Sequence, residues 1–152
     1  MNWDFVVFAA DTPMNTDEEG AAVFPDDWAP SAIGTLTDIR HNLSAMFPTL
    51  NWSDTPNGVL TGDDFALEFL LENSETVTSF SIYARGNATQ TLLQIIRDTN
   101  WRLLDIASSE WLNLAQDPDK GRRQFQEYLN TVAKTHYPPE KRGFFARLLG
   151  RQ

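Results

Sequence analysis

The strongest constraint on the fold is a short apolar run near the start of the chain, WDFVVFAA at residues 3–10. β-Branched and aromatic side chains dominate this run, as they do in strands. Apolar side chains would point to both faces of such a strand, so both faces have to be covered by other parts of the protein. We therefore expect residues 3–10 to form a strand in the centre of a sheet.

Two segments have the spacing of amphipathic helices. Residues 31–47 begin after a proline, end before Pro48, and carry one apolar stripe formed by Ile33, Leu36, Ile39, Leu43, Met46 and Phe47. Asn87 precedes residues 88–99 as an N-terminal cap, and these residues carry a second stripe formed by Leu92, Ile95 and Ile96. The sequence therefore predicts two helices, each with one face against the core.

Short strands are expected between and after these helices. Residues 49–58 are rich in turn-forming residues and are expected to form turns. Val59–Leu60 and Phe65–Leu71 form a predicted hairpin, because the second of these segments alternates apolar and polar side chains. Residues 77–86 and 101–106 have the composition of two further strands. Together these segments predict an antiparallel meander.

A third helix is expected over residues 118–134, where Asp117 and the proline after it suit a helix start. The segment between this helix and the strand at 101–106, SSEWLNL, fits either a turn with a short strand or a continuation of the preceding strand. The predicted order is therefore β-α-β-β-β-α-β-α. It indicates an α+β fold with helices packed on one face of a mixed, mostly antiparallel sheet.

The chain length of 152 residues suits one domain. We expect residues 1–137 to form it, because two prolines end the predicted third helix. Residues 138–152 follow as a basic, apolar tail, and helical spacing would gather on one side Phe144, Phe145, Leu148 and Leu149. Three interpretations of the tail stay open: packing on its own domain, which we favour, weak attachment to a membrane surface, or docking in a partner's groove.

Several absences limit the class of protein. The chain has no cysteine, which excludes disulfides, thiolate zinc sites and a cysteine nucleophile. Its first residues carry an acid and no basic leader, so a signal peptide is not expected. No apolar run approaches the roughly 20 residues that span a bilayer. We therefore expect a cytoplasmic protein without stable membrane insertion.

The net charge of −9 conceals an asymmetry between the two parts of the chain. Residues 1–84 contain 14 acids and one base, whereas residues 85–152 contain seven acids and 11 bases. Such polarity indicates either a charged partner or a fold in which the two parts interleave and their charges face water. Phosphate repels carboxylate, so nucleic acid is not expected to bind the acidic part.

Residues for catalysis or metal binding are sparse. The two histidines, His41 and His136, stand far apart and in none of the spacings that bind zinc. The sequence contains neither a nucleophile elbow nor a phosphate-binding loop. Tandem acids are more typical of solvated surface than of an acid–base pair or a cation site. The sequence therefore predicts no catalytic residue, no metal site and no cofactor.

Acidic segments that contain tryptophan favour a binding function. DDWAP at residues 26–30 and NWSD at residues 51–54 combine carboxylates with an aromatic side chain that is enriched at interface hot spots. Alternatively, both tryptophans cover the ends of the core. The predicted partner-binding residues are Asp17, Glu18, Glu19, Asp26, Asp27, Trp28, Asp63 and Asp64.

The sequence resembles small bacterial immunity proteins of polymorphic toxin and type VI secretion systems. The resemblance covers residues 2–113 and is carried by the order of its elements and by the phrases WDFVVFAADTP, DDWAP, MFPTLNWSD, GVLTGDDFALEFLLE, VTSFSIYARG and NWRLLDIASSEWL. Immunity proteins of this kind are small, acidic and free of catalytic motifs. They bind a cognate effector tightly, often over its active site.

This resemblance implies a non-enzymatic, cytoplasmic protein that neutralises a cognate toxin by covering it with an acidic surface. A nuclease toxin would be basic and would suit such a surface. Whether the protein forms a homodimer stays open. The alternative function is a non-catalytic adaptor or scaffold that docks on a partner or a membrane through its tail, residues 138–152.

Overall fold

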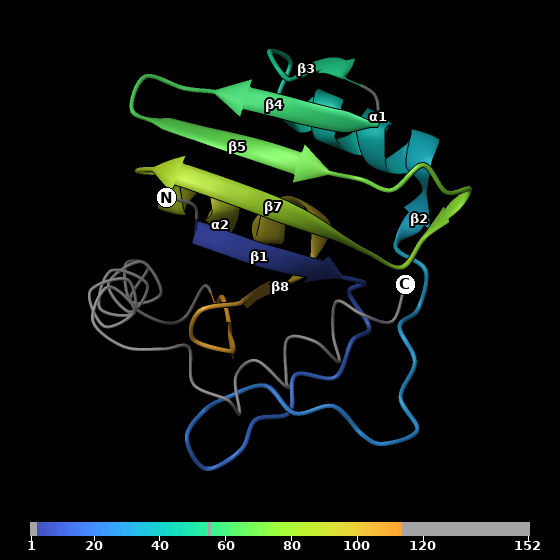
Figure 1. Cartoon of the computed structure of the whole chain (residues 1–152). Coiled ribbons are helices and arrows are strands. Elements are labelled where there is room, and N and C mark those ends of the chain that lie inside the picture. Colours follow the sequence, from blue (N-terminus) through green and yellow to red (C-terminus); the bar gives the residue numbers. More distant parts are fainter. Residues whose placement is uncertain (1–2, 55, 114–152) are drawn as a thin grey trace.

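In the computed structural model, residues 3–54 and 56–113 are described, and they form a seven-stranded antiparallel sheet with two helices behind it (Figure 1). In spatial order the strands are β3 (Asn51–Asp54), β4 (Asn57–Thr61), β5 (Phe65–Leu70), β7 (Ser79–Gly86), β1 (Trp3–Phe8), β8 (Arg102–Asp105) and β9 (Glu110–Trp111). The predicted α+β class, with helices packed on one face of the sheet, is confirmed. The predicted third helix and the tail lie outside the described residues, as does the predicted domain boundary at residue 137.

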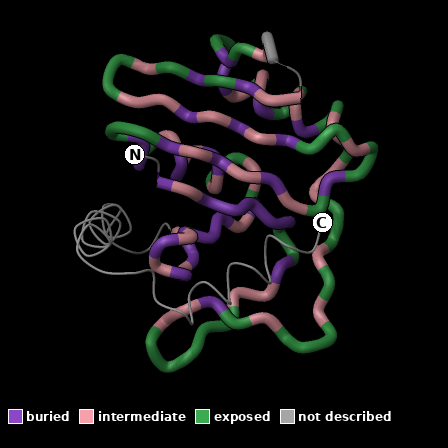
Figure 2. Tube along the Cα trace, in the orientation of Figure 1, coloured by how far each residue is buried: buried purple, intermediate pink, exposed green. Residues whose placement is uncertain are grey.

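Strand β1 occupies the interior of the sheet, as its apolar sequence predicts. It pairs antiparallel with β7 on one side and with β8 on the other. Phe5 and Val7 are buried on the back face, toward the helices, whereas Val6 and Phe8 are buried on the front face. Most of β1 is therefore buried (Figure 2). The strand ends at Phe8, and the chain then turns, because the backbone and hydroxyl of Thr12 both donate to the carbonyl of Ala9.

The main core lies between the back face of the sheet and the helices α1 (Leu36–Met46) and α2 (Thr89–Thr99). Its fully buried large side chains include Phe5, Ile39, Leu43, Leu67, Phe69, Ile82, Leu92, Ile95 and Leu103. Burial of each such side chain stabilises the fold by about 1.5–3 kcal/mol relative to exposure. Both helices therefore bury the apolar stripe that their sequences predict.

Helix α1 begins later than its sequence predicts. The Thr35 hydroxyl accepts a hydrogen bond from the backbone N–H of Asp38 at 3.1 Å, which makes Thr35 the N-terminal cap. Ahead of it, Gly34–Thr35 forms a two-residue strand, β2, that pairs with β6 (Thr76–Val77). The predicted start at residue 31 is wrong because Gly34 and Thr35 pair with β6, and the backbone N–H of Ile33 donates to the carbonyl of Val77, in place of a first helical turn.

Helix α2 starts without the predicted cap. Its N-cap is Ala88, which makes no side-chain capping bond. Asn87 instead donates from its backbone to the carbonyl of Asp64 at 2.9 Å and from its side chain to the carboxylate of Asp64 at 3.3 Å. Asn87 therefore ties the turn before α2 to the β4–β5 hairpin rather than closing the helix.

Strand β3 is an element that the sequence did not predict, since residues 49–58 were expected to form turns. It pairs with β4 at the edge of the sheet, with an irregular register. Trp52 packs its ring against Gly58, donates from its indole to Ser44 at 2.8 Å, and lies beneath the guanidinium of Arg40 at 4.9 Å from the ring centroid. These long-range contacts stabilise a strand whose own residues favour turns.

We predict that Gly86→Ala lowers the free energy of unfolding by about 2 kcal/mol or more, because Gly86 has a φ of +72° and an added Cβ would collide with the backbone of Asp64. Gly34→Ala is the control, since its Cβ would lie 3.7 Å from the Cβ of Asp38, an ordinary contact. Chemical denaturation measures both variants. Equal stability of the two would contradict the proposed role of Gly86.

Candidate protein-binding surface

The acidic loop, residues 9–33, links β1 to β2 and carries six acids and no base. It packs over the front face of the sheet at β1, β8 and β9, where Ala22 is buried and Met14 contacts the same cluster. The backbone N–H of Ala22 donates to the carbonyl of Ser109 at 2.6 Å, and Ala22 also pairs with Thr16 in an isolated bridge. The loop is therefore fastened to the sheet at its middle.

Four aromatic rings form a front aromatic cluster where this loop meets the sheet. The loop contributes two of them and the sheet the other two: Phe24, Trp28, Phe8 and Trp111. Phe24 and Trp28 stack with ring centroids 4.6 Å apart, and Phe8 meets Trp28 edge to face at 5.8 Å. Trp111 contacts both phenylalanines, at 6.0 and 5.8 Å. Each such aromatic pair adds about 0.5–1.5 kcal/mol beyond the area that it buries. The loop is thus held in place by packing and not only by its backbone.

Five of the predicted binding residues, all acids, lie exposed on the acidic loop: Asp17, Glu18, Glu19, Asp26 and Asp27. The Asp17 carboxylate accepts from the backbone of Glu19 at 2.8 Å and of Ala21 at 3.0 Å, so it also orders its own turn. The backbone of Trp28 donates to the carbonyl of Pro25 at 3.0 Å, which closes the turn that carries the second acidic pair. The structure therefore places these carboxylates on two defined turns, and the second turn, with Asp26 and Asp27, ends at Trp28.

Trp28, the sixth predicted residue, is half-buried. One part of its ring stacks on Phe24, while the residues on either side of it, Asp27 and Ala29, are exposed. The sequence left open whether this tryptophan covers the core or binds a partner. It does cover the core, and its partial exposure leaves a contact surface as well.

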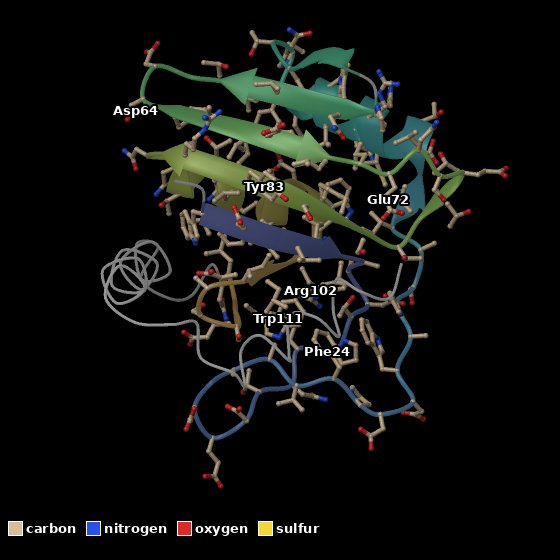
Figure 3. All side chains as sticks on the ribbon, viewed as in Figure 1. Phe24, Asp64, Glu72, Tyr83, Arg102 and Trp111 are labelled. Carbon is tan, nitrogen blue, oxygen red and sulfur yellow. The ribbon has the colours of Figure 1, made fainter. Side chains whose placement is uncertain are left out.

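Asp63 and Asp64 lie elsewhere on the molecule. They are exposed at the turn between β4 and β5, and Asp64 accepts the two hydrogen bonds from Asn87. Strand β7 separates this hairpin from β1 and from the acidic loop, and Figure 3 shows Asp64 at the opposite end of the sheet from Phe24. The acidic loop thus carries six of the eight predicted residues, on two separate turns, and this pair lies elsewhere.

The described part of the chain is strongly acidic. Residues 3–54 and 56–113 contain 17 acids and four bases, a formal charge of −13. Among the bases, Arg40 lies over Trp52, Arg85 is opposite Ala66 in the β5–β7 ladder, and Arg102 is opposite Phe8 in the β1–β8 ladder. Strand β8 and helix α2 come from the second part of the sequence and pack against strands from the first part. Few of the bases of the chain lie on these two elements.

Two carboxyls have perturbed pKa values, the half-buried Asp4 and the buried Asp105, and they lie on opposite faces of the sheet. Burial raises the pKa of Asp4, on the front face of β1. Burial also raises the pKa of Asp105 to about 6, although hydrogen bonds from Trp3 and from the backbone of residues 107 and 108 oppose the shift. Asp105 accepts from the Trp3 indole at 3.1 Å and from Ala107 at 3.0 Å, so it orders the turn after β8.

No group of three potential metal ligands lies within the described ranges. His41 is exposed on α1, and His136 lies outside the described residues. Within the same described part of the chain, no helix combines the length and the apolar character needed to cross a membrane.

Sequence reasoning missed three residues of this surface: Phe24, Arg102 and Trp111. Phe24 ends an apolar run, AAVF, inside an otherwise acidic loop, and such a run is the signal that part of the loop is buried. Trp111 lies in the segment whose structure the sequence left open. Its role depends on the pairing of β9 with β8, which places Trp111 opposite Leu104.

No protein-family model, curated protein or solved structure matches this chain. The resemblance to immunity proteins therefore remains a prediction, and the function is argued below from the chemistry of the surface itself.

We predict that wild-type stability falls, relative to Asp105→Asn, as the pH rises from about 4 to about 6. The pKa of Asp105 is higher in the folded protein than its ordinary value of 3.8, so the folded state binds more protons than the unfolded chain in this window. The difference should total about 1–3 kcal/mol, measured by urea denaturation at several pH values. Parallel pH profiles for the two proteins would contradict the assignment.

The variant Trp3→Phe tests the same assignment by changing the residue that donates a hydrogen bond to Asp105. It removes the indole that stabilises the charged carboxylate, so it should raise the pKa of Asp105 further and extend the pH-dependent window to higher pH. A window that moves to lower pH would show that another group dominates the titration.

Proposed function

We propose that this chain is an immunity-type binding protein that neutralises a cognate bacterial toxin by covering it. The observation that carries the proposal is the structure of the acidic loop. This loop displays exposed carboxylates on ordered turns, and it includes the half-buried Trp28, which packs in the front aromatic cluster. We place the main contact on Asp17, Glu18, Glu19, Asp26, Asp27 and Trp28.

Pre-organisation supports this proposal. A loop that is already ordered loses less conformational entropy when it binds, so more of the contact energy remains as affinity. The Phe24–Trp28 stack and the Ala22–Ser109 hydrogen bond supply this order in the free protein. A tryptophan that is held in one orientation, with carboxylates around it, has the character of an interface hot spot with a charged rim.

The charge of the surface indicates the chemistry of the partner. The formal charge of −13 on the described part of the chain attracts basic proteins and accelerates their association. A nuclease has to present cations to the phosphates of its substrate, and carboxylates can occupy such a cationic site. A basic toxin such as a nuclease, encountered in the cytoplasm, is therefore the partner that this surface suits best.

Binding is better supported than catalysis. The carboxyls with raised pKa values, Asp4 and Asp105, face opposite sides of the sheet and cannot act on one substrate together. Asp105 is 2% exposed and accepts hydrogen bonds from its own turn, which is a structural task. An enzyme would need convergent polar groups around one pocket.

The second candidate function is a non-catalytic adaptor that docks through residues 138–152. It is favoured by the basic and apolar composition of that tail. The two functions differ in the surface that a partner contacts, so charge changes confined to the acidic loop distinguish them.

We predict that Asp26→Lys with Asp27→Lys weakens binding to the toxin by at least about tenfold and makes binding less sensitive to salt, because these carboxylates would face the partner's cations. The matched control is Asp63→Lys with Asp64→Lys, which changes the net charge equally at the remote hairpin. Calorimetry or biolayer interferometry at several salt concentrations measures both variants against the toxin recovered with the tagged wild-type protein from its native organism.

Rescue of growth in cells that express this toxin provides the functional readout. Equal losses of affinity in both variants would attribute binding to net charge alone and sink the placement on the loop. Binding that only tail variants weaken would establish the adaptor function, and a failure of the wild-type protein to bind or protect would overturn the immunity function.

A further inference from the structure

The turn between β8 and β9, residues 106–109, connects the sheet to the acidic loop. The backbone N–H of Ser109 donates to the carbonyl of Asp105 at 2.8 Å, which brings the chain back alongside β8 to form β9. The carbonyl of Ser109 then accepts the backbone N–H of Ala22 at 2.6 Å. This turn therefore stands between a buried carboxyl of the sheet and the middle of the loop.

The side chain of Asp105 holds the β8–β9 turn in shape. Its Oδ1 accepts the backbone N–H groups of Ala107 at 3.0 Å and Ser108 at 3.5 Å. Its Oδ2 accepts the indole N–H of Trp3, on β1, at 3.1 Å. Ala107 and Ser109 are buried together with the carboxyl. The carboxyl is thus held by β1 and by its own turn, and the turn closes over it.

Ser109 gives this turn a strained conformation. Its φ is +61°, in the left-handed region that residues with a Cβ rarely adopt. The contacts of Asp105 have to hold Ser109 there, because an open turn would relax the backbone. Opening would also withdraw the carbonyl that Ala22 binds. The turn is therefore a hinge, and the fastening of the loop at Ala22 depends on its closed form.

Closure of the turn also changes the protonation of Asp105. Burial raises the pKa of this carboxyl from 3.8 to about 6 in the closed turn, although the hydrogen bonds oppose the shift. An open turn returns the carboxyl to water and to its ordinary pKa, so opening releases a proton between these two values. The closed turn is therefore most stable at acid pH, and it opens more readily as the pH rises through about 6.

The charged residues on the elements around Asp105 are Asp4 on β1, Arg102 on β8 itself, Glu110 on β9, and Arg97 and Asp98 on α2. Asp4 and Arg102 lie on the front face, opposite to Asp105, and the two charges of α2 are exposed. Glu110 is opposite Asp105 in the β8–β9 ladder, where its negative charge would act in the same direction as burial. Burial is the largest cause of the raised pKa.

We propose that Asp105 positions the acidic loop, and that its ionisation favours release of the loop at Ala22 through the Ser109 turn. At acid pH the neutral carboxyl keeps the turn closed and the loop fastened. At neutral pH the ionised carboxyl gains hydration whenever the turn opens, so the loop is released more often. This inference concerns the free protein and does not depend on the proposed function.

Hydrogen exchange of the Ala22 amide, measured by NMR on the full-length protein from about pH 4.5 to about pH 7, tests the inference. After correction for the intrinsic pH dependence of exchange, the opening equilibrium at Ala22 should rise at least about tenfold across this range. The control is the amide of Phe47, which donates to the carbonyl of Leu43 at the end of α1 and should change less than about twofold. A flat profile at Ala22, or an equal rise at both amides, would overturn the proposal.

The variant Asp105→Asn keeps the shape of the side chain and cannot ionise. In this variant the opening equilibrium at Ala22 should be the same at both ends of the pH range, while Phe47 reports that the protein is folded. A pH profile as steep as that of the wild type would assign the titration to another group and overturn the proposal.

The variant Ser109→Gly tests the link through the turn without removing the carboxyl. Glycine adopts a φ of +61° without strain, so Ala22 should open several-fold less often at every pH and keep the pH dependence of the wild type. Unchanged opening at Ala22 in this variant would show that the turn does not control the loop, and would overturn the proposal even if Asp105→Asn failed to fold.

Discussion

Burial of β1 on both faces is the constraint on which the rest of the structure depends. Phe5 and Val7 need a cover on the back of the sheet, and α1 and α2 provide it. Val6 and Phe8 need a cover on the front, where the chain has no helix among residues 3–54 and 56–113. The acidic loop takes this place, and it can do so because Ala22, Phe24 and Trp28 are apolar within an otherwise charged segment. A structural requirement of β1 therefore determines where the carboxylates of this loop are displayed.

The two faces of the sheet differ in how polar groups are treated. On the back, the one buried carboxyl of the sheet, Asp105, accepts hydrogen bonds from Trp3 and from its own turn. On the front, one side-chain polar atom each of Asp4, Arg102 and Trp111 is buried without a hydrogen-bond partner. Two further atoms of this kind lie on the helices behind the sheet, Arg40 Nε of α1 and Thr89 Oγ1 of α2, so unpaired atoms alone do not mark one face as an interface.

Elements defined by local pattern could be predicted from the sequence. The apolar run at residues 3–10, the stripe on α1 and the alternation in β5 each determine a burial pattern without reference to the rest of the chain. Elements defined by distant contacts could not be predicted. Strand β3 depends on Trp52 meeting Gly58 and Arg40, and Asn87 leaves its capping position because Asp64 lies within reach. The acids and Trp28 of the candidate binding surface could be predicted from the composition of the loop. Trp111 could not, because its position depends on the pairing of β9 with β8.

Electrostatics links the fold to the order of charges along the chain. The described part of the chain, with a formal charge of −13, repels itself, and like charges on one loop add to that cost. Selection for stability alone would disperse such acids or pair them with nearby bases, yet residues 9–33 contain no base at all. Eight of the twelve bases follow residue 113 in the sequence instead. No ion pair can therefore form within the acidic loop itself, and the loop keeps its full negative charge.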